Sequence, residues 1–135
     1  MKAQVITFGH PLSEGTRDFL STVEGDFNVY SCFLHFEKFS EVLEGVQEAT
    51  HELLSQGVDL SGNTKTYLVP PGSSVAAMAV VTVWDALAGG HPKLLNLIRK
   101  DHQYIPSPEK PVLDLHEFKQ KIRSMRGKLL KAVTA

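Results

Sequence analysis

Two loops of the sequence carry residue types suited to binding a phosphate group. The first joins a run of strand-forming residues to a predicted helix and consists of Pro70, Pro71, Gly72, Ser73 and Ser74. The prolines fix the direction of the chain, and the glycine lets the backbone approach a ligand closely. The serine hydroxyls and the unpaired N–H groups of a helix N-terminus can donate hydrogen bonds to an anion. An ordinary capped turn uses the same residues, so the sequence leaves both interpretations open.

The second loop follows the first predicted strand and consists of Gly9, His10, Pro11, Leu12 and Ser13. His10 can donate to a phosphate or act as a general acid or base near neutral pH, although the pattern taken alone favours a loop histidine without a role. Arg99, at the end of a predicted fourth strand, is also placed to meet a phosphate.

The sequence lacks the motifs of several other nucleotide-binding, catalytic and metal sites. The loop at 70–74 has neither the Gly-Lys-Ser/Thr ending of a Walker loop nor a GxGxxG fingerprint, and no Gly-x-Ser-x-Gly elbow occurs. The six histidines form no His-Glu-x-x-His pair, so we expect no metal and no cofactor. The single cysteine, Cys32, lies in an apolar run, which predicts a buried core residue rather than a nucleophile.

Strand and helix patterns alternate along the chain. Strands are predicted at 5–8, 27–36, 66–69, 94–98 and, at a sheet edge, 112–115. Helices are predicted from a Ser13 cap to Val23, from a Ser40 cap through 42–54 to Gly57, at 75–87, and on the stripe Phe118, Ile122, Met125 and Leu129. This alternation predicts one α/β domain over residues 1–135, with a Rossmann-like, mainly parallel sheet flanked by helices. Ligands of such sheets bind at the carboxyl ends of the strands, where both loops would lie.

Composition limits the partners that we expect. A net charge of −1 argues against bulk DNA or RNA binding. The longest apolar stretch, 75–88, is too short to span a bilayer, and no signal peptide is recognisable, so we expect a cytoplasmic protein without a membrane partner. The last helix is basic, which indicates a solvated face or an attraction for an anionic ligand or RNA.

Three segments resemble motifs of a small CRISPR-associated family, Csx family fifteen. Residues 6–13 (Ile-Thr-Phe-Gly-His-Pro-Leu-Ser) resemble its first strand and the following "F-S-H-P-L-[ST]" loop, with Gly9 where the family often has serine. Residues 67–77 resemble its "V-N-P-P-G" strand-to-helix junction, and residues 91–99 resemble its "H-F-P-x-I-L-R-L-R" strand. The likeness covers most of the chain except about residues 24–60.

The resemblance implies a fold related to CARF domains and a homodimer, with a higher assembly on ligand binding as a further possibility. It implies a cyclic oligoadenylate ligand, cyclic tetra-adenylate in the first place, which is the second messenger of type III CRISPR defence. The ligand is symmetric, so a two-fold dimer with one shared pocket suits it. The site residues implied together by the residue types and the resemblance are Gly9, His10, Pro11, Ser13, Pro71, Gly72, Ser73, Ser74 and Arg99.

Three functions compete at this point. The first is a binding protein that sequesters the messenger and lowers defence signalling. The second is a metal-independent ring nuclease, in which a ribose 2′-OH attacks the adjacent phosphate and His10 acts as acid or base. The apparent lack of a second acid or base favours binding. The third is a nucleotide-free interaction module that uses the apolar helix at 75–87.

Overall fold

The computed structural model describes residues 2–34 and 39–134 and has a central five-stranded sheet. Its strands are β1 (Ala3–Phe8), β2 (Phe27–Cys32), β3 (Thr66–Leu68), β4 (Lys93–Leu95) and β7 (Val112–Asp114). The strand order is β2-β1-β3-β4-β7; the first four run parallel, and β7 pairs antiparallel with β4 at the edge. The predicted α/β class and the predicted edge strand are therefore confirmed, and the topology is compatible with a Rossmann-like fold.

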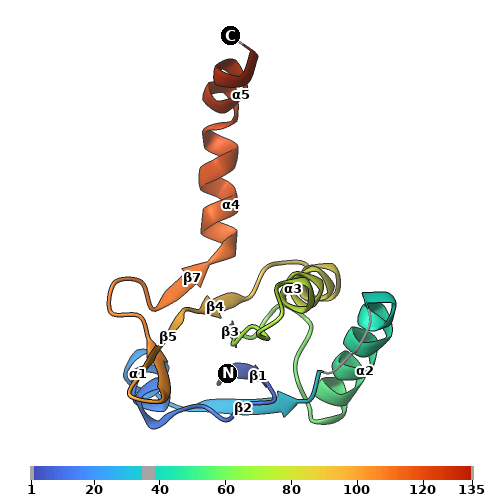
Figure 1. Ribbon diagram of the computed structural model, residues 1–135, viewed down its shortest axis with the longest axis vertical. Helices are drawn as coiled ribbons and strands as arrows, with labels where there is room; N and C mark the ends of the chain where they lie inside the picture. Colours follow the sequence, from blue (N-terminus) through green and yellow to red (C-terminus); the bar gives the residue numbers. More distant parts are fainter. Residues whose placement is uncertain (1, 35–38, 135) are drawn as a thin grey trace.

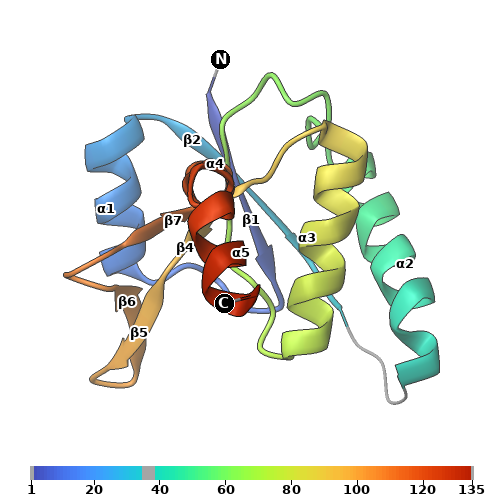
Figure 2. The ribbon, with the colours of Figure 1, turned by 90° about the horizontal axis from the view of Figure 1, so that it is seen from above.

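Helices cover both faces of the sheet (Figure 1). Helix α1 (Glu14–Glu24) lies on one face, and α2 (Val42–Ser55) and α3 (Ser74–Ala88) lie side by side on the other (Figure 2). Side chains alternate between the faces along β1, so that Val5 packs with Leu20 of α1 while Ile6 packs with Val46 of α2 and Trp84 of α3. Each face thus has its own apolar core.

The predicted Ser13 cap is confirmed, and α3 starts at Ser74, one residue before the predicted start, with Ser73 as its cap. The Ser13 hydroxyl accepts from the N–H of Thr16 at 3.2 Å, and the Ser73 hydroxyl accepts from the N–H of Ala76 at 3.3 Å. The predicted Ser40 cap was wrong. A 3-10 turn, Phe39–Glu41, leads into α2, whose N-cap is Glu41 without a side-chain cap bond.

Two predicted strands have different boundaries. The strand predicted at 27–36 ends at Cys32, and positions 35 and 36 lie outside the described residues. The prediction of one strand at 94–98 was wrong, because the chain leaves the sheet at Asn96. The Asn96 backbone N–H donates to the carbonyl oxygen of Pro111 at 2.9 Å, and its side-chain amide donates to that of Lys110 at 2.9 Å. These bonds hold Asn96 against the segment that precedes β7, so the next strand starts in a new direction.

That next strand belongs to a hairpin, which was not predicted. Strand β5 (Leu97–Lys100) pairs antiparallel with β6 (Gln103–Pro106) in a separate two-stranded sheet. The hairpin packs against the first turn of α1, where a Cβ on Gly15 would come within 3.3 Å of the Ile105 side chain. The hairpin therefore has a fixed place beside the carboxyl ends of the main strands.

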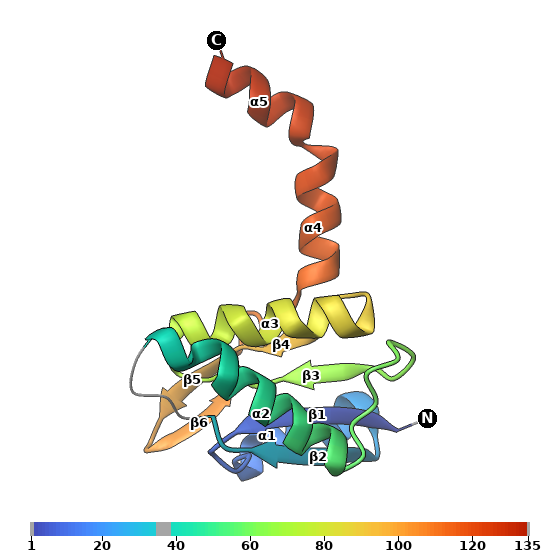
Figure 3. The ribbon, with the colours of Figure 1, turned by 90° about the vertical axis from the view of Figure 1, so that its right-hand side faces the viewer.

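The chain ends in two helices that project from the body. Helix α4 (Leu115–Ser124) begins at the end of β7 with Asp114 as its cap, and α5 (Arg126–Thr134) continues it after a bend at Met125 (Figure 3). All side chains from His116 to Lys131 are exposed. We call residues 115–134 the C-terminal arm.

Candidate functional site

A cleft of about 590 Å³ lies at the carboxyl ends of β1, β3 and β4. Its volume lies in the range of small-molecule sites. One wall comes from the two predicted phosphate-binding loops, and the opposite wall comes from the β5–β6 hairpin. The lining residues are His10, Pro11, Leu12, Ser13, Val69, Pro70, Gly72, Leu95, Asn96, Leu97, His102, Gln103 and Tyr104.

The structure brings part of the predicted site together in this cleft. His10 and Ser13 line it from the first loop, together with Pro11, and Gly72 lines it from the second. The remaining predicted residues, which are Gly9, Pro71, Ser73, Ser74 and Arg99, are not part of its lining.

Ser13 links the two walls of the cleft by a hydrogen bond, in addition to capping α1. Its hydroxyl donates to the backbone carbonyl oxygen of Tyr104 at 2.5 Å, and the Thr16 hydroxyl donates to the same oxygen at 3.2 Å. Ser13 therefore fastens the hairpin wall to the loop wall. Its proton is committed to this bond, so a ligand would compete with the hairpin for it.

Ser73 has a similar positioning role in the loop at 70–74. Because its hydroxyl accepts from Ala76, it fixes the first turn of α3 rather than reaching into the cleft. The first N–H groups of a helix have no partner within the helix, and the helix dipole makes this end partly positive. Gly72 places this helix end next to the cleft, and a Cβ at position 72 would meet no atom within 4 Å.

The hairpin contributes three residues that the sequence analysis missed: His102, Gln103 and Tyr104. Asp101 and His102 form its two-residue turn with φ of 50° and 65°, in the left-handed region used by tight hairpins. A pair of aspartate and histidine between two short runs of strand formers was the available signal. It is weaker than Asn-Gly or Asp-Gly, because histidine adopts positive φ less readily than glycine.

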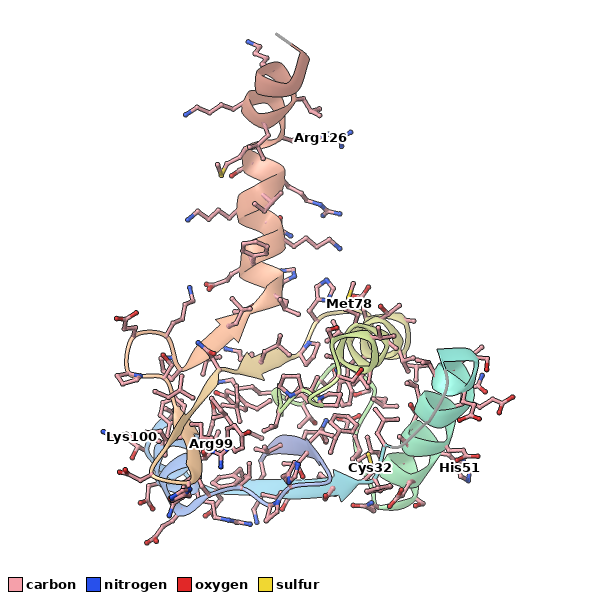
Figure 4. All side chains as sticks on the ribbon, in the orientation of Figure 1. Cys32, His51, Met78, Arg99, Lys100 and Arg126 are labelled. Carbon is pink, nitrogen blue, oxygen red and sulfur yellow. The ribbon has the colours of Figure 1, made fainter. Side chains whose placement is uncertain are left out.

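Arg99 lies beside the cleft, but not at the end of a sheet strand as predicted. It belongs to β5, directly opposite Tyr104 in the hairpin, so both side chains leave the same face of the ribbon. Figure 4 shows Arg99 and Lys100 on the hairpin, away from the main sheet.

The charge of the cleft suits an anion. Among the described residues that line it, none is an aspartate, glutamate, lysine or arginine. Its titratable groups include two imidazoles, those of His10 and His102, and the nearby helix end adds a positive dipole. An anionic ligand would therefore meet hydrogen-bond donors and no carboxylate among these lining residues.

Other candidate groups lie outside this site. Cys32 is buried between the sheet and α2, where burial raises the pKa of its thiol to about 12, so the residue belongs to the core as predicted (Figure 4). Within residues 2–34 and 39–134, no group of three histidine, cysteine or acidic side chains is arranged to hold a metal ion.

The fold and the cleft define the class: an α/β protein with a ligand-sized cleft at the carboxyl ends of its parallel strands. Comparisons of the chain with protein-family models, curated proteins and solved structures found no match. In the part of the chain that the structure describes, no helix has the length and apolar character needed to cross a membrane.

Proposed function

We propose that this protein binds a cyclic oligoadenylate, specifically cyclic tetra-adenylate, in the strand-end cleft and lowers type III CRISPR signalling by sequestering it. The observation that carries the proposal is the position of the two phosphate-suited loops. His10 and Gly72, 62 residues apart in the sequence, line one cleft that contains no acidic side chain among its described lining residues. Both loops belong to the segments that resemble the CRISPR-associated family.

The size of the cleft supports a shared ligand. A volume of about 590 Å³ suits a drug-sized molecule, whereas cyclic tetra-adenylate contains four nucleotides. One cleft would therefore hold part of the ring, and a second copy would hold the remainder. The ring has rotational symmetry, so a homodimer with a two-fold axis through the ligand presents equivalent groups to equivalent phosphates.

Within each cleft the contacts divide by chemistry. The imidazole of His10 and the N-terminal N–H groups of α3 would donate to phosphate oxygens. Tyr104, which is 54% exposed, offers an aromatic face on which an adenine can stack. Arg99, from the same face of the hairpin, would add a charge-assisted bond at the rim.

One observation favours ring nuclease activity as a second function. His102 lies in the same cleft as His10, so the site has the second acid or base that the sequence analysis did not find. In that reaction one imidazole accepts the proton of a ribose 2′-OH as its oxygen attacks the adjacent phosphorus. The other imidazole protonates the departing 5′ oxygen, which leaves a 2′,3′-cyclic phosphate and a 5′-OH.

Isothermal titration with cyclic tetra-adenylate tests the binding proposal. We expect saturable binding at one ring per two chains, and much weaker binding of linear tetra-adenylate, which lacks the closed symmetric shape. A chain that binds neither molecule would contradict the proposal. Equal affinity for both would contradict recognition of the ring.

A further inference from the structure

Helix α3 carries an exposed apolar face on the side opposite its core residues. Val75, Met78, Thr82 and Ala86 follow one another at helical spacing and are all exposed, Met78 to 71%. Ala76, Val80 and Trp84 face the sheet and are buried. The Thr82 hydroxyl donates to the carbonyl oxygen of Met78 within the helix, so this polar group is already paired. We call these four exposed residues the α3 outer face.

The C-terminal arm carries a second exposed apolar stripe. Phe118, Ile122, Met125 and Leu129 recur at i, i+4, i+7 and i+11 and are 36–53% exposed. An amphipathic helix normally buries such a stripe against its own domain, but here the stripe stays open to solvent. The described part of the same chain therefore leaves the apolar stripe of the arm uncovered.

The arm differs in net charge from the rest of the chain. From residue 116 onward the sequence has six lysines and arginines and one glutamate, whereas residues 1–115 have eight basic and fourteen acidic residues. The basic side chains flank the apolar stripe. On the body, exposed Glu44, Glu48 and Glu52 form a row along α2, which packs beside α3. The arm and the α2–α3 surface are therefore complementary in charge as well as in apolar character.

The two surfaces lie on the same side of the molecule. Figure 1 shows the arm rising from the β7 edge of the sheet, and Figure 4 shows Met78 on the side of α3 toward which the arm projects. We propose that the C-terminal arm of one copy packs on the α3 outer face of a second copy, and that the second copy returns the same contact. The exchange buries both stripes and brings each basic arm near the partner's acidic α2.

The arrangement is compatible with the strand-end cleft but does not depend on it. A two-fold axis parallel to the strands would pair the α3 sides of two copies and leave both clefts opening at the same end of the dimer. The arm exchange concerns a different surface, so it is tested without any nucleotide. A chain that fails to bind cyclic tetra-adenylate would leave the exchange intact, and the reverse also holds.

Disulfide crosslinking between two single variants tests the contact directly. We would mix a Met78→Cys chain with an Ile122→Cys chain and oxidise them under mild conditions. The expected product is a covalent dimer with one chain of each kind, well above the yield from either variant alone or from the wild type. The native Cys32 does not interfere, because it is buried. Absence of the mixed dimer would overturn the arm exchange.

Light scattering on size-exclusion fractions supplies the second test. We expect the wild type to be dimeric, and both Met78→Asp and Ile122→Asp to raise the dimer dissociation constant at least tenfold while circular dichroism stays unchanged. Val23→Asp is the matched control, since Val23 is an exposed apolar residue of α1, on the opposite face of the sheet. A monomeric wild type, or a dimer that tolerates Ile122→Asp, would overturn the proposal.

Discussion

The hydroxyl of Ser13 donates a hydrogen bond to the backbone carbonyl oxygen of Tyr104 at 2.5 Å, across 91 residues of sequence. The same hydroxyl caps α1, so one side chain sets both the first turn of that helix and the position of the hairpin. The cleft exists because the hairpin stands opposite the two loops. Ser13 is therefore a positioning residue as much as a predicted ligand contact.

Ser13→Ala should lose the helix cap and the hairpin bond together. We expect a loss of about 2 kcal/mol in the free energy of unfolding, against about 1 kcal/mol for Ser73→Ala, which removes a cap alone. Urea unfolding measures both values. Ser13→Thr keeps the hydroxyl and should recover most of the loss. Equal costs for the two alanine variants would show that the bond to Tyr104 contributes nothing.

The two cleft histidines should matter for the ligand and not for the fold. We expect His10→Ala and His102→Ala each to weaken cyclic tetra-adenylate binding about tenfold, equal to about 1.4 kcal/mol, because each removes a donor to a phosphate. His51→Ala is the control, since His51 is exposed on α2 and points away from the sheet (Figure 4). Unchanged affinity in both cleft variants would remove the imidazoles from the site.

A partly exposed ion pair at the amino end of the sheet predicts a pH dependence of stability. Glu24 accepts from the Tyr67 hydroxyl at 2.5 Å and from the Lys65 ammonium at 2.9 Å. Partial burial raises the pKa of Glu24, but the bonds from Tyr67 and Lys65 outweigh it, and the pKa lies below its ordinary value. A lowered folded-state pKa stabilises the fold above the ordinary value of 4.5, and this contribution disappears as pH falls through the folded-state value.

Tyr67→Phe should therefore destabilise the protein by about 1–2 kcal/mol near neutral pH, and the difference from the wild type should shrink when Glu24 is protonated. Urea unfolding at about pH 7 and about pH 3 measures this change. Tyr30→Phe, at a half-buried tyrosine of β2, should show no such trend. A pH-independent effect of Tyr67→Phe would mean that the bond to Glu24 does not stabilise the fold.

Two glycines with positive φ should respond differently to alanine. Gly57 (φ +99°) has open space around it, so Gly57→Ala should cost only the backbone strain, about 1 kcal/mol. Gly62 (φ +86°) is different, because a Cβ there would collide with the carbonyl oxygen of Ala88 at the end of α3. We expect Gly62→Ala to cost about 3 kcal/mol or more. Thermal unfolding of both variants makes the comparison, and equal costs would mean that the loop moves freely away from α3.

Local signals in the sequence predicted the elements that local chemistry determines. Ser13 was recognisable as a cap because a hydroxyl before a helical pattern satisfies a backbone N–H regardless of tertiary structure. The buried position of Cys32 followed from its apolar neighbours. The order of strands and helices likewise followed from alternating patterns, and the structure confirms an α/β sheet with helices on both faces.

The features that were not predicted depend on contacts between residues far apart in the sequence. The run at 94–98 is apolar throughout, and its division into β4 and β5 depends on bonds from Asn96 to Lys110 and Pro111, which no local pattern reveals. For the same reason, the predicted site did not include the hairpin wall with His102 and Tyr104. The stripe from Phe118 to Leu129 predicted one helix, whereas the structure divides this segment at Met125 into α4 and α5. The stripe also gave no sign that these helices would stand away from the sheet.

The most direct test of sequestration is to mix the protein in excess with cyclic tetra-adenylate. One sample is then analysed by native gel and by product chromatography. We expect a shifted complex from which the ring is recovered intact after hours. Linear products with a 2′,3′-cyclic phosphate end would replace sequestration by ring nuclease activity and make His10 and His102 its candidate acid and base. A sample with neither a shifted complex nor products would contradict the assignment of the cleft to this messenger.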